Sequence, residues 1–109
     1  MKIKNRIKSR QDFQETIRKG QSIKNAEYIV YYLKNNLGYA RVGVSAPTKV
    51  GNAVKRNRIR RQIKAMLNQI LDLNRPIDLI VVSRKNYKIE ENHDHNKQSL
   101  EKLIKSIGE

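Results

Sequence analysis

One long segment of the chain is amphipathic, and it restricts what the remaining residues can form. Apolar side chains recur at helical spacing from residue 59 to residue 71, so one stripe of a helix must face a core. The stripe consists of Ile59, Ile63, Met66, Leu67, Ile70 and Leu71. A helix with a single apolar face needs a sheet or another helix to cover that face. The rest of the chain is therefore expected to supply a small scaffold.

The same segment carries a dense run of positive charge at its start. Residues 49–64 contain seven Lys or Arg and no Asp or Glu. Asn52 is the expected N-cap of the helix, because its side-chain oxygen can accept from the first unpaired backbone amides. Lys55 and Arg56 fall in line with the apolar stripe, one turn before Ile59, where an unpaired charge cannot be buried. We therefore expect this first turn to extend past the core and to present both charges beyond its edge.

The charge of the whole chain is as one-sided as this segment. The formal net charge is +14 and the isoelectric point is about 10.3. No Asp or Glu occurs from Tyr28 to Leu71, although nine Lys or Arg do. Such a surface repels itself, and a bound polyanion relieves the repulsion. Nucleic acid or an anionic membrane surface is therefore the natural partner.

Targeting and redox features favour a cytoplasmic setting. No run of 18 apolar residues is present, so no segment is expected to span a membrane. The basic N-terminus lacks the apolar stretch of a signal peptide. The chain has no cysteine, which excludes disulfides, thiolate catalysis and zinc–thiolate sites.

The 109 residues are expected to form one domain, because a chain of this length supports a single core. Helices are predicted at 9–19, after Asn52 and at 97–107, and strands are predicted at 27–33, 39–46 and 78–84. A further strand is allowed around residues 21–24, and residues 87–96 are expected to form a polar loop. Strands joined by helices indicate an α/β sandwich of two layers, with helices packed on a small sheet.

Two stretches of this scaffold leave alternatives open. Over residues 1–8, Lys and Arg alternate with Ile and Asn, which favours an extended arm that is either solvated or in contact with nucleic acid. Farther along, Ser9 is the expected N-cap of the first helix, and Phe13 and Ile17 share a face of it. The residue pattern alone favours a core position for Phe13. Gly43 lies inside a strand and lets another group approach closely, so its face of the sheet is expected to form the floor of a groove.

Side chains that could catalyse hydrolysis are scarce. A metal-dependent nuclease needs clustered carboxylates, and the one dense group of acids contains Glu90, Glu91 and Asp94. The two neighbouring histidines, two residues apart, are a weak metal signal, so we interpret this group as surface. By contrast, Arg makes bidentate contacts to phosphate, and a helix N-terminus attracts anions. The pattern predicts a protein that binds rather than one that breaks bonds.

The basic segment also resembles a known family. Its pattern, Lys49-x-Gly51-Asn52-Ala53-Val54-x-Arg56-Asn57-Arg58-Ile59-x-Arg61, is similar to the hallmark helix of the bacterial ribonuclease P protein subunit. Further matches fall in family order and spacing, so the resemblance covers the chain from about residue 6 to residue 107. They are Arg6-Ile7-Lys8, Asp12-Phe13, Gly20, Tyr31, Arg41-Val42-Gly43-Val44-Ser45 and Arg84-Lys85.

The resemblance implies both a fold and a function. The fold is a four-stranded sheet with three helices, in the order α-β-β-β-α-β-α, with a left-handed crossover where a right-handed one is the general rule. The function is to partner a catalytic RNA, which uses Mg²⁺ to remove the 5′ leader from precursor tRNA. The protein helps to bind substrate and metal ions and does not perform the chemistry. The implied partners are the catalytic RNA and precursor tRNA, with no membrane and no obligate protein partner.

The resemblance also implies two surfaces that face RNA. The first joins the residues matched to the family's helix with two lysines of the same basic run: Lys49, Asn52, Lys55, Arg56, Asn57, Arg58, Arg60, Arg61 and Lys64. The second is a cleft for the leader between the first helix and the sheet, formed by Phe13, Ile17 and Tyr31. Phe13 thereby changes from a core residue to a platform on which a base can stack.

Four departures from the family pattern lie outside the hallmark helix. Ile17 stands where a second aromatic is common, and Ala26 stands where a basic residue is frequent. Pro47-Thr48 replaces a usual Ser-Lys, and Asn86 replaces a frequent Pro. These changes bear on contacts to the leader.

Two other functions are compatible with parts of the pattern. A structural RNA-binding module, such as a ribosomal protein, would share the basic composition but would have no need of the cleft. An autonomous metal nuclease would use Glu90, Glu91 and Asp94 and would cleave RNA without an RNA subunit.

Overall fold

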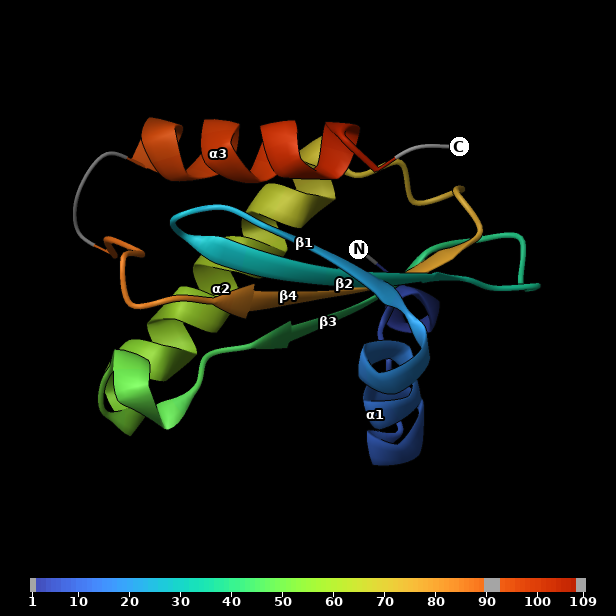
Figure 1. Ribbon diagram of the computed structural model, residues 1–109, viewed down its shortest axis with the longest axis horizontal. Helices are drawn as coiled ribbons and strands as arrows, with labels where there is room; N and C mark the ends of the chain where they lie inside the picture. Colours follow the sequence, from blue (N-terminus) through green and yellow to red (C-terminus); the bar gives the residue numbers. More distant parts are fainter. Residues whose placement is uncertain (1, 90–92, 108–109) are drawn as a thin grey trace.

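The computed structural model describes residues 2–89 and 93–107, which form one mixed sheet with helices on both of its sides (Figure 1). The helices are α1 (Arg10–Lys19), α2 (Ala53–Ile70) and α3 (His93–Lys105), and short 3₁₀ turns cover Ile3–Asn5 and Thr48–Val50. The strands are β1 (Gln21–Lys24), β2 (Tyr28–Lys34), β3 (Arg41–Ser45) and β4 (Ile77–Ser83). The predicted element order is confirmed, and the strand allowed around residues 21–24 exists as β1.

The strands lie in the order β1-β2-β4-β3. The β1–β2 and β2–β4 pairs are antiparallel, whereas β3 and β4 are parallel and are connected through α2. The register places Tyr31 of β2 and Gly43 of β3 on either side of Ile80 in β4. These three residues therefore form a row across the sheet, and that row faces α1.

The main core lies between the other face of the sheet and helices α2 and α3. The predicted stripe of α2 packs there, and Ile59, Ile63, Met66 and Leu67 are each at most 1% exposed. The sheet contributes Tyr28 and Val30 from β2 and Leu79 and Val81 from β4. Strand β4 is the most buried strand, as its run of apolar residues predicts. Each side of the sheet is thus covered, as an α/β sandwich requires.

The N-terminal arm is more ordered than its alternating pattern predicts. Residues Ile3–Asn5 form a 3₁₀ turn, and Asn5 is buried with its Nδ2 donating to the carbonyl of Ala40 at 2.7 Å. The extended part begins at Arg6, which bridges to Val42 in parallel. The prediction of a fully extended arm is therefore wrong, because a buried amide side chain and a strand edge hold it against β3.

The segment after β4 is also better packed than a polar loop. Tyr87 is 4% exposed, and its ring packs edge-on against the ring of Tyr28 with 5.7 Å between the ring centroids. Its hydroxyl donates to Oε1 of Gln62 at 2.7 Å. Helix α3 begins at His93, four residues before the predicted start. Asn96 lies inside this helix and is buried, with its side chain donating to the carbonyl of Lys88. Polar composition concealed these contacts, because the polar groups of Tyr87 and Asn96 each find a hydrogen-bond partner within the fold.

Candidate nucleic-acid interface

The basic run begins at a helix N-terminus with a well-formed cap. The side chain of Asn52 accepts a hydrogen bond from the backbone amide of Lys55 at 2.9 Å, as predicted. Gly51 precedes it with φ = +151°, a conformation that favours glycine. A side chain at this position would lie 2.6 Å from Cδ of Lys55, so the lysine stem packs against the glycine. The remaining amides of this first turn point away from the helix, where they can attract an anion.

Most cations of the basic run project into solvent, and three of them have no compensating acid among the described residues. Lys49, Lys55, Arg58, Arg61 and Lys64 are exposed, and so are Asn52 and Asn57. Within residues 2–89 and 93–107, Lys55, Arg61 and Lys64 form no ion pair. Exposed cations of one sign that form no ion pair within the fold are the electrostatic footprint of a polyanion-binding face.

A shallow hollow of about 430 Å³ runs along this face of α2. Its walls are Val54, Asn57, Arg60, Arg61 and Lys64, which recur at helical spacing. Arg60 is half-buried and donates to Oδ1 of Asn57, so the two side chains are held together. Val54 is 71% exposed in the middle of the charges. Sequence reasoning did not single out Val54, although an apolar residue opposite the buried stripe was a usable signal.

Arg56 departs from its predicted environment. Lys55 is exposed as expected, but Arg56 is half-buried, and its Nε atom is enclosed without a hydrogen-bond partner among the described residues. The prediction that both side chains extend past the core is therefore wrong for Arg56. Its stem lies in line with the apolar stripe, and a long arginine side chain can bury its stem while its terminal nitrogens reach outward.

The residues of the predicted leader cleft lie on the face of the sheet opposite the main core. Phe13 is half-buried and packs on Gly43, since a Cβ placed at Gly43 would lie 2.7 Å from Cε2 of the Phe13 ring. The close approach that Gly43 was expected to allow is therefore made by Phe13 itself. Tyr31 lies half-buried in the same row as Gly43, and Ile17 is 36% exposed on α1. None of these three residues belongs to the main core cluster, which leaves the role of Phe13 as a stacking platform as a prediction.

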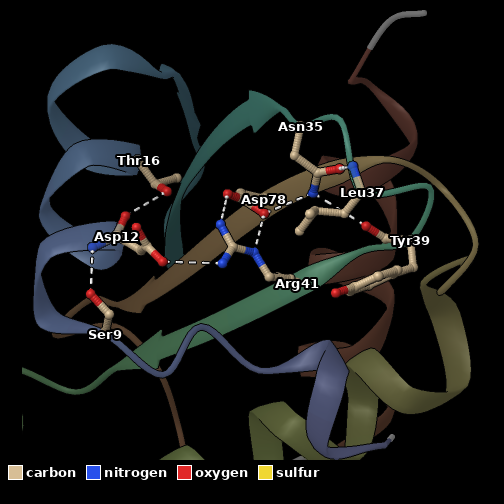
Figure 2. Close-up of polar contacts among 8 residues, drawn as sticks. All are labelled: Ser9, Asp12, Thr16, Asn35, Leu37, Tyr39, Arg41 and Asp78. Carbon is tan, nitrogen blue, oxygen red and sulfur yellow. Dashed lines mark hydrogen bonds and ion pairs between the residues drawn. The ribbon is translucent and has the colours of Figure 1, made fainter.

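A network of ions fixes α1 to this face (Figure 2). Arg41 donates to both oxygens of Asp78, from Nε at 2.9 Å and from Nη2 at 2.6 Å, and its Nη1 reaches Oδ2 of Asp12 at 3.1 Å. Asp78 is 5% exposed and also accepts from Nδ2 of Asn35 at 2.8 Å. The hydrogen bonds to Asp78 raise the pKa of Arg41 above its already high ordinary value. The guanidinium therefore joins β3, β4 and α1 at one point.

The cap of α1 extends the same network. The hydroxyl of Ser9 accepts from the amide of Asp12 at 3.1 Å, as predicted, and Thr16 donates to the carbonyl of Asp12 at 2.9 Å. Asp12 therefore links the cap to Arg41. Sequence reasoning missed this ion cluster, although Asp78 at the start of an apolar strand required a partner.

No metal site emerges from the described acids and histidines. Glu90 and Glu91 of the dense acidic group lie outside the described residues, and Asp94 is exposed at the start of α3. Within the described ranges, no three His, Asp or Glu side chains gather closely enough to hold an ion. No helix of the described chain is both long and apolar enough to cross a bilayer.

Comparisons with known proteins agree with this geometry. The family model Ribonuclease P matches residues 1–108. The ribonuclease P protein component of Mesoplasma florum is 38% identical over 106 residues, which cover 95% of this chain and 96% of the relative. That of Bacillus mycoides is also 38% identical, over 110 residues, with 99% of this chain and 95% of the relative covered.

Solved structures give the same assignment. The RNase P protein of Staphylococcus aureus is 34% identical with a TM-score of 0.78, and the match covers 93% of each chain. The RNase P protein of Thermotoga maritima is 26% identical with a TM-score of 0.82, covering 95% of this chain and 98% of that one. The resemblance carried by the basic helix is thus confirmed over the full described fold. The chain belongs to the ribonuclease P protein family.

Proposed function

We propose that this chain is the protein subunit of a ribonuclease P ribonucleoprotein, which acts in the 5′ maturation of tRNA. The observation that carries the proposal is the exposed face of α2, where a capped helix N-terminus is followed by Lys55, Arg61 and Lys64, which form no ion pair with any described residue. This face would bind the catalytic RNA. Arg61 offers a planar fork for bidentate contact with phosphate, and Lys64 adds a point charge. Asn57 can pair with ribose hydroxyls and base edges.

The second surface would bind the 5′ leader of precursor tRNA. Phe13 and Tyr31 present aromatic rings on the α1 side of the sheet, away from the main core. Aromatic rings stack on single-stranded bases without requiring a particular sequence. Because Phe13 is pressed against Gly43, its ring is held in position before the leader arrives. Such pre-organisation lowers the ordering cost of binding.

The chemistry of cleavage would belong to the RNA subunit. Mg²⁺ bound mainly by that RNA and by the substrate would supply the activated water and charge stabilisation. The protein's own contribution would be to bind and position RNA. A ribonucleoprotein that matures tRNA would act in the cytoplasm.

Reconstitution with the matching catalytic RNA and a precursor tRNA tests the proposal. The wild-type protein is expected to promote leader removal at physiological Mg²⁺, whereas the Arg56/Arg58/Arg61 triple alanine variant should fail to do so while remaining folded. Lys24→Ala, an exposed change on β1, is the control for loss of a positive charge outside α2. Normal processing by the triple variant would refute the assignment of α2. The protein without any RNA subunit is expected to leave precursor tRNA intact.

A further inference from the structure

A second and larger hollow is lined by segments that meet at the end of the sheet farthest from the first turn of α2; Figure 1 shows how these segments are arranged. Its volume is about 740 Å³, within the usual range for small-ligand sites. Four segments that are distant in sequence line it: the end of α1 with the start of β1, the end of β2, the turn leading into β4, and Ile107 after α3. Neither the basic face of α2 nor the predicted leader cleft of Phe13, Ile17 and Tyr31 contributes a residue to it.

Hydrogen bonds between these segments fix the walls. The amide of Asn35 donates to the carbonyl of Pro76 at 3.1 Å, and Nη2 of Arg75 donates to the carbonyl of Ile107 at 3.2 Å. The hydroxyl of Tyr32 donates to Oε1 of Gln21 at 2.8 Å across the β1–β2 pair. The hollow is therefore formed before any ligand arrives, and little ordering cost opposes binding.

The lining combines an apolar floor with a cationic rim. Leu33, Ile77 and Ile107 supply apolar surface, and the ring of Tyr32 is half-buried beside them. The charged residues of the lining are Lys19, Lys34 and Arg75, with no acid among them.

The two lysines of the rim differ in their partners. Lys19 pairs with Glu15 at 2.8 Å, and both side chains are at least a third exposed, so this ion pair holds the lysine only weakly. Lys34 is exposed and makes no ion pair with any residue in the described part of the chain. Lys34 is therefore the cation of the rim that is most available to a ligand.

We propose that this hollow binds one nucleotide of single-stranded RNA. The base would lie against Tyr32 and the apolar floor, since stacking on an aromatic ring accepts any base. The phosphate would lie at Lys34, with Lys19 beside it. RNA is favoured over an acidic protein segment because the site couples an aromatic ring to cations in a chain of net charge +14. The proposal rests on the proposed function only in taking RNA as the partner, and it adds a third contact at the opposite end of the molecule.

Titration of the isotope-labelled full chain with adenosine 5′-monophosphate, followed through amide resonances, tests the proposal. Saturable shifts are expected at residues 32–35 and at Ile77. Tyr32→Leu keeps an apolar side chain in place and should weaken this binding about fivefold or more through lost stacking. Lys34→Ala should weaken it about threefold, as removal of one exposed charge contact does. Lys24→Ala removes an exposed lysine outside the hollow and should leave the affinity unchanged.

Three results would overturn the proposal. Shifts confined to α2 would place the nucleotide elsewhere, and equal weakening by Lys24→Ala and Lys34→Ala would reduce the effect to overall charge. Tighter binding of a glutamate-rich peptide at residues 32–35 would indicate a protein partner instead. Because the titration contains no catalytic RNA, its failure leaves the processing role intact. Failure of the reconstitution, conversely, leaves a positive titration intact.

Discussion

Arg41 and the cations of α2 carry the same charge in opposite surroundings. Arg41 is held by Asp78 and Asp12, and its side chain is 21% exposed, whereas Arg61 and Lys64 are exposed with no ion pair among the described residues. A cation with nearby acids is neutralised within the fold and supports architecture. Cations without acids leave a net positive field that a bound polyanion can neutralise. The difference in partners, rather than in residue type, thus distinguishes the structural Arg41 from the cations proposed to bind RNA.

Arg41→Ala should produce the largest loss of stability. It leaves the buried carboxylate of Asp78 with Asn35 as its remaining side-chain partner, and breaking such a buried pair costs about 3 kcal/mol or more. Urea unfolding measures the loss, with Arg61→Ala as the matched control expected within about 0.5 kcal/mol of wild type. If Arg41→Ala and Arg61→Ala were equally stable, the ion pairs of Arg41 would not stabilise the fold as proposed.

Gly43→Ala should cause the next largest loss of stability, about 1–3 kcal/mol. The added methyl carbon would lie 2.7 Å from Cε2 of the Phe13 ring, so the ring must shift from its place on the sheet. The affinity for precursor tRNA should fall while that for mature tRNA is retained, because only the precursor carries a leader. In a Phe13→Ala background the same change should cost almost nothing, which a double-mutant cycle would show. An unchanged cost in that background would exclude the Phe13–Gly43 contact as the cause.

Asn52→Ala tests a residue that serves both purposes. Loss of the cap should destabilise the protein by about 1 kcal/mol and should also fray the turn that carries Lys55 and Arg56. Ser9→Ala removes the corresponding cap of α1 and is the control. Both variants should lower the melting temperature, but only Asn52→Ala should weaken binding to the catalytic RNA. If Asn52→Ala and Ser9→Ala bound the catalytic RNA with equal affinity, the N-terminus of α2 would have no role in RNA binding.

A smaller effect is expected from Glu27, another acid whose hydrogen-bond partners lie within the fold. Partial burial opposes its ionisation, but hydrogen bonds from Ser99, at 2.6 Å, and from His95 outweigh this and lower its pKa below the ordinary value near 4.5. The stabilisation is present above the unfolded-state pKa and is lost as the pH falls through the lower folded-state pKa. Acid unfolding of Glu27→Gln should therefore show less loss of stability below about pH 4.5. Identical pH profiles for variant and wild type would contradict this role.

Local patterns predicted the elements well because local physics determines them. Ser9 and Asn52 cap their helices as expected, and the apolar stripe of α2 is buried. The contacts that escaped prediction join segments distant in sequence: Asn5 with Ala40, Arg41 with Asp78, and Tyr87 with Gln62. A polar side chain in such a pair looks like surface until its partner is placed beside it.

In the candidate site, too, contacts between segments distant in sequence escaped prediction. The cations of α2 could be predicted because one helix carries them all, and most of them are exposed. The half-burial of Arg56 and the packing of Phe13 on Gly43 depend on how a helix lies against its neighbours. The larger hollow at the end of the sheet is formed by four segments that are distant in sequence, so no local sequence pattern predicts it.

The central claim is that the unpaired cations of α2, and not the paired Arg41, bind the catalytic RNA. The most direct test is the salt dependence of that affinity for wild type and for a Lys55/Arg61/Lys64 triple alanine variant. Several phosphate contacts should give the wild type roughly a 10³-fold loss between low and moderate salt. The variant should bind more weakly, with a salt slope shallower by about one for each contact removed. An unchanged affinity and slope in the variant would contradict the account.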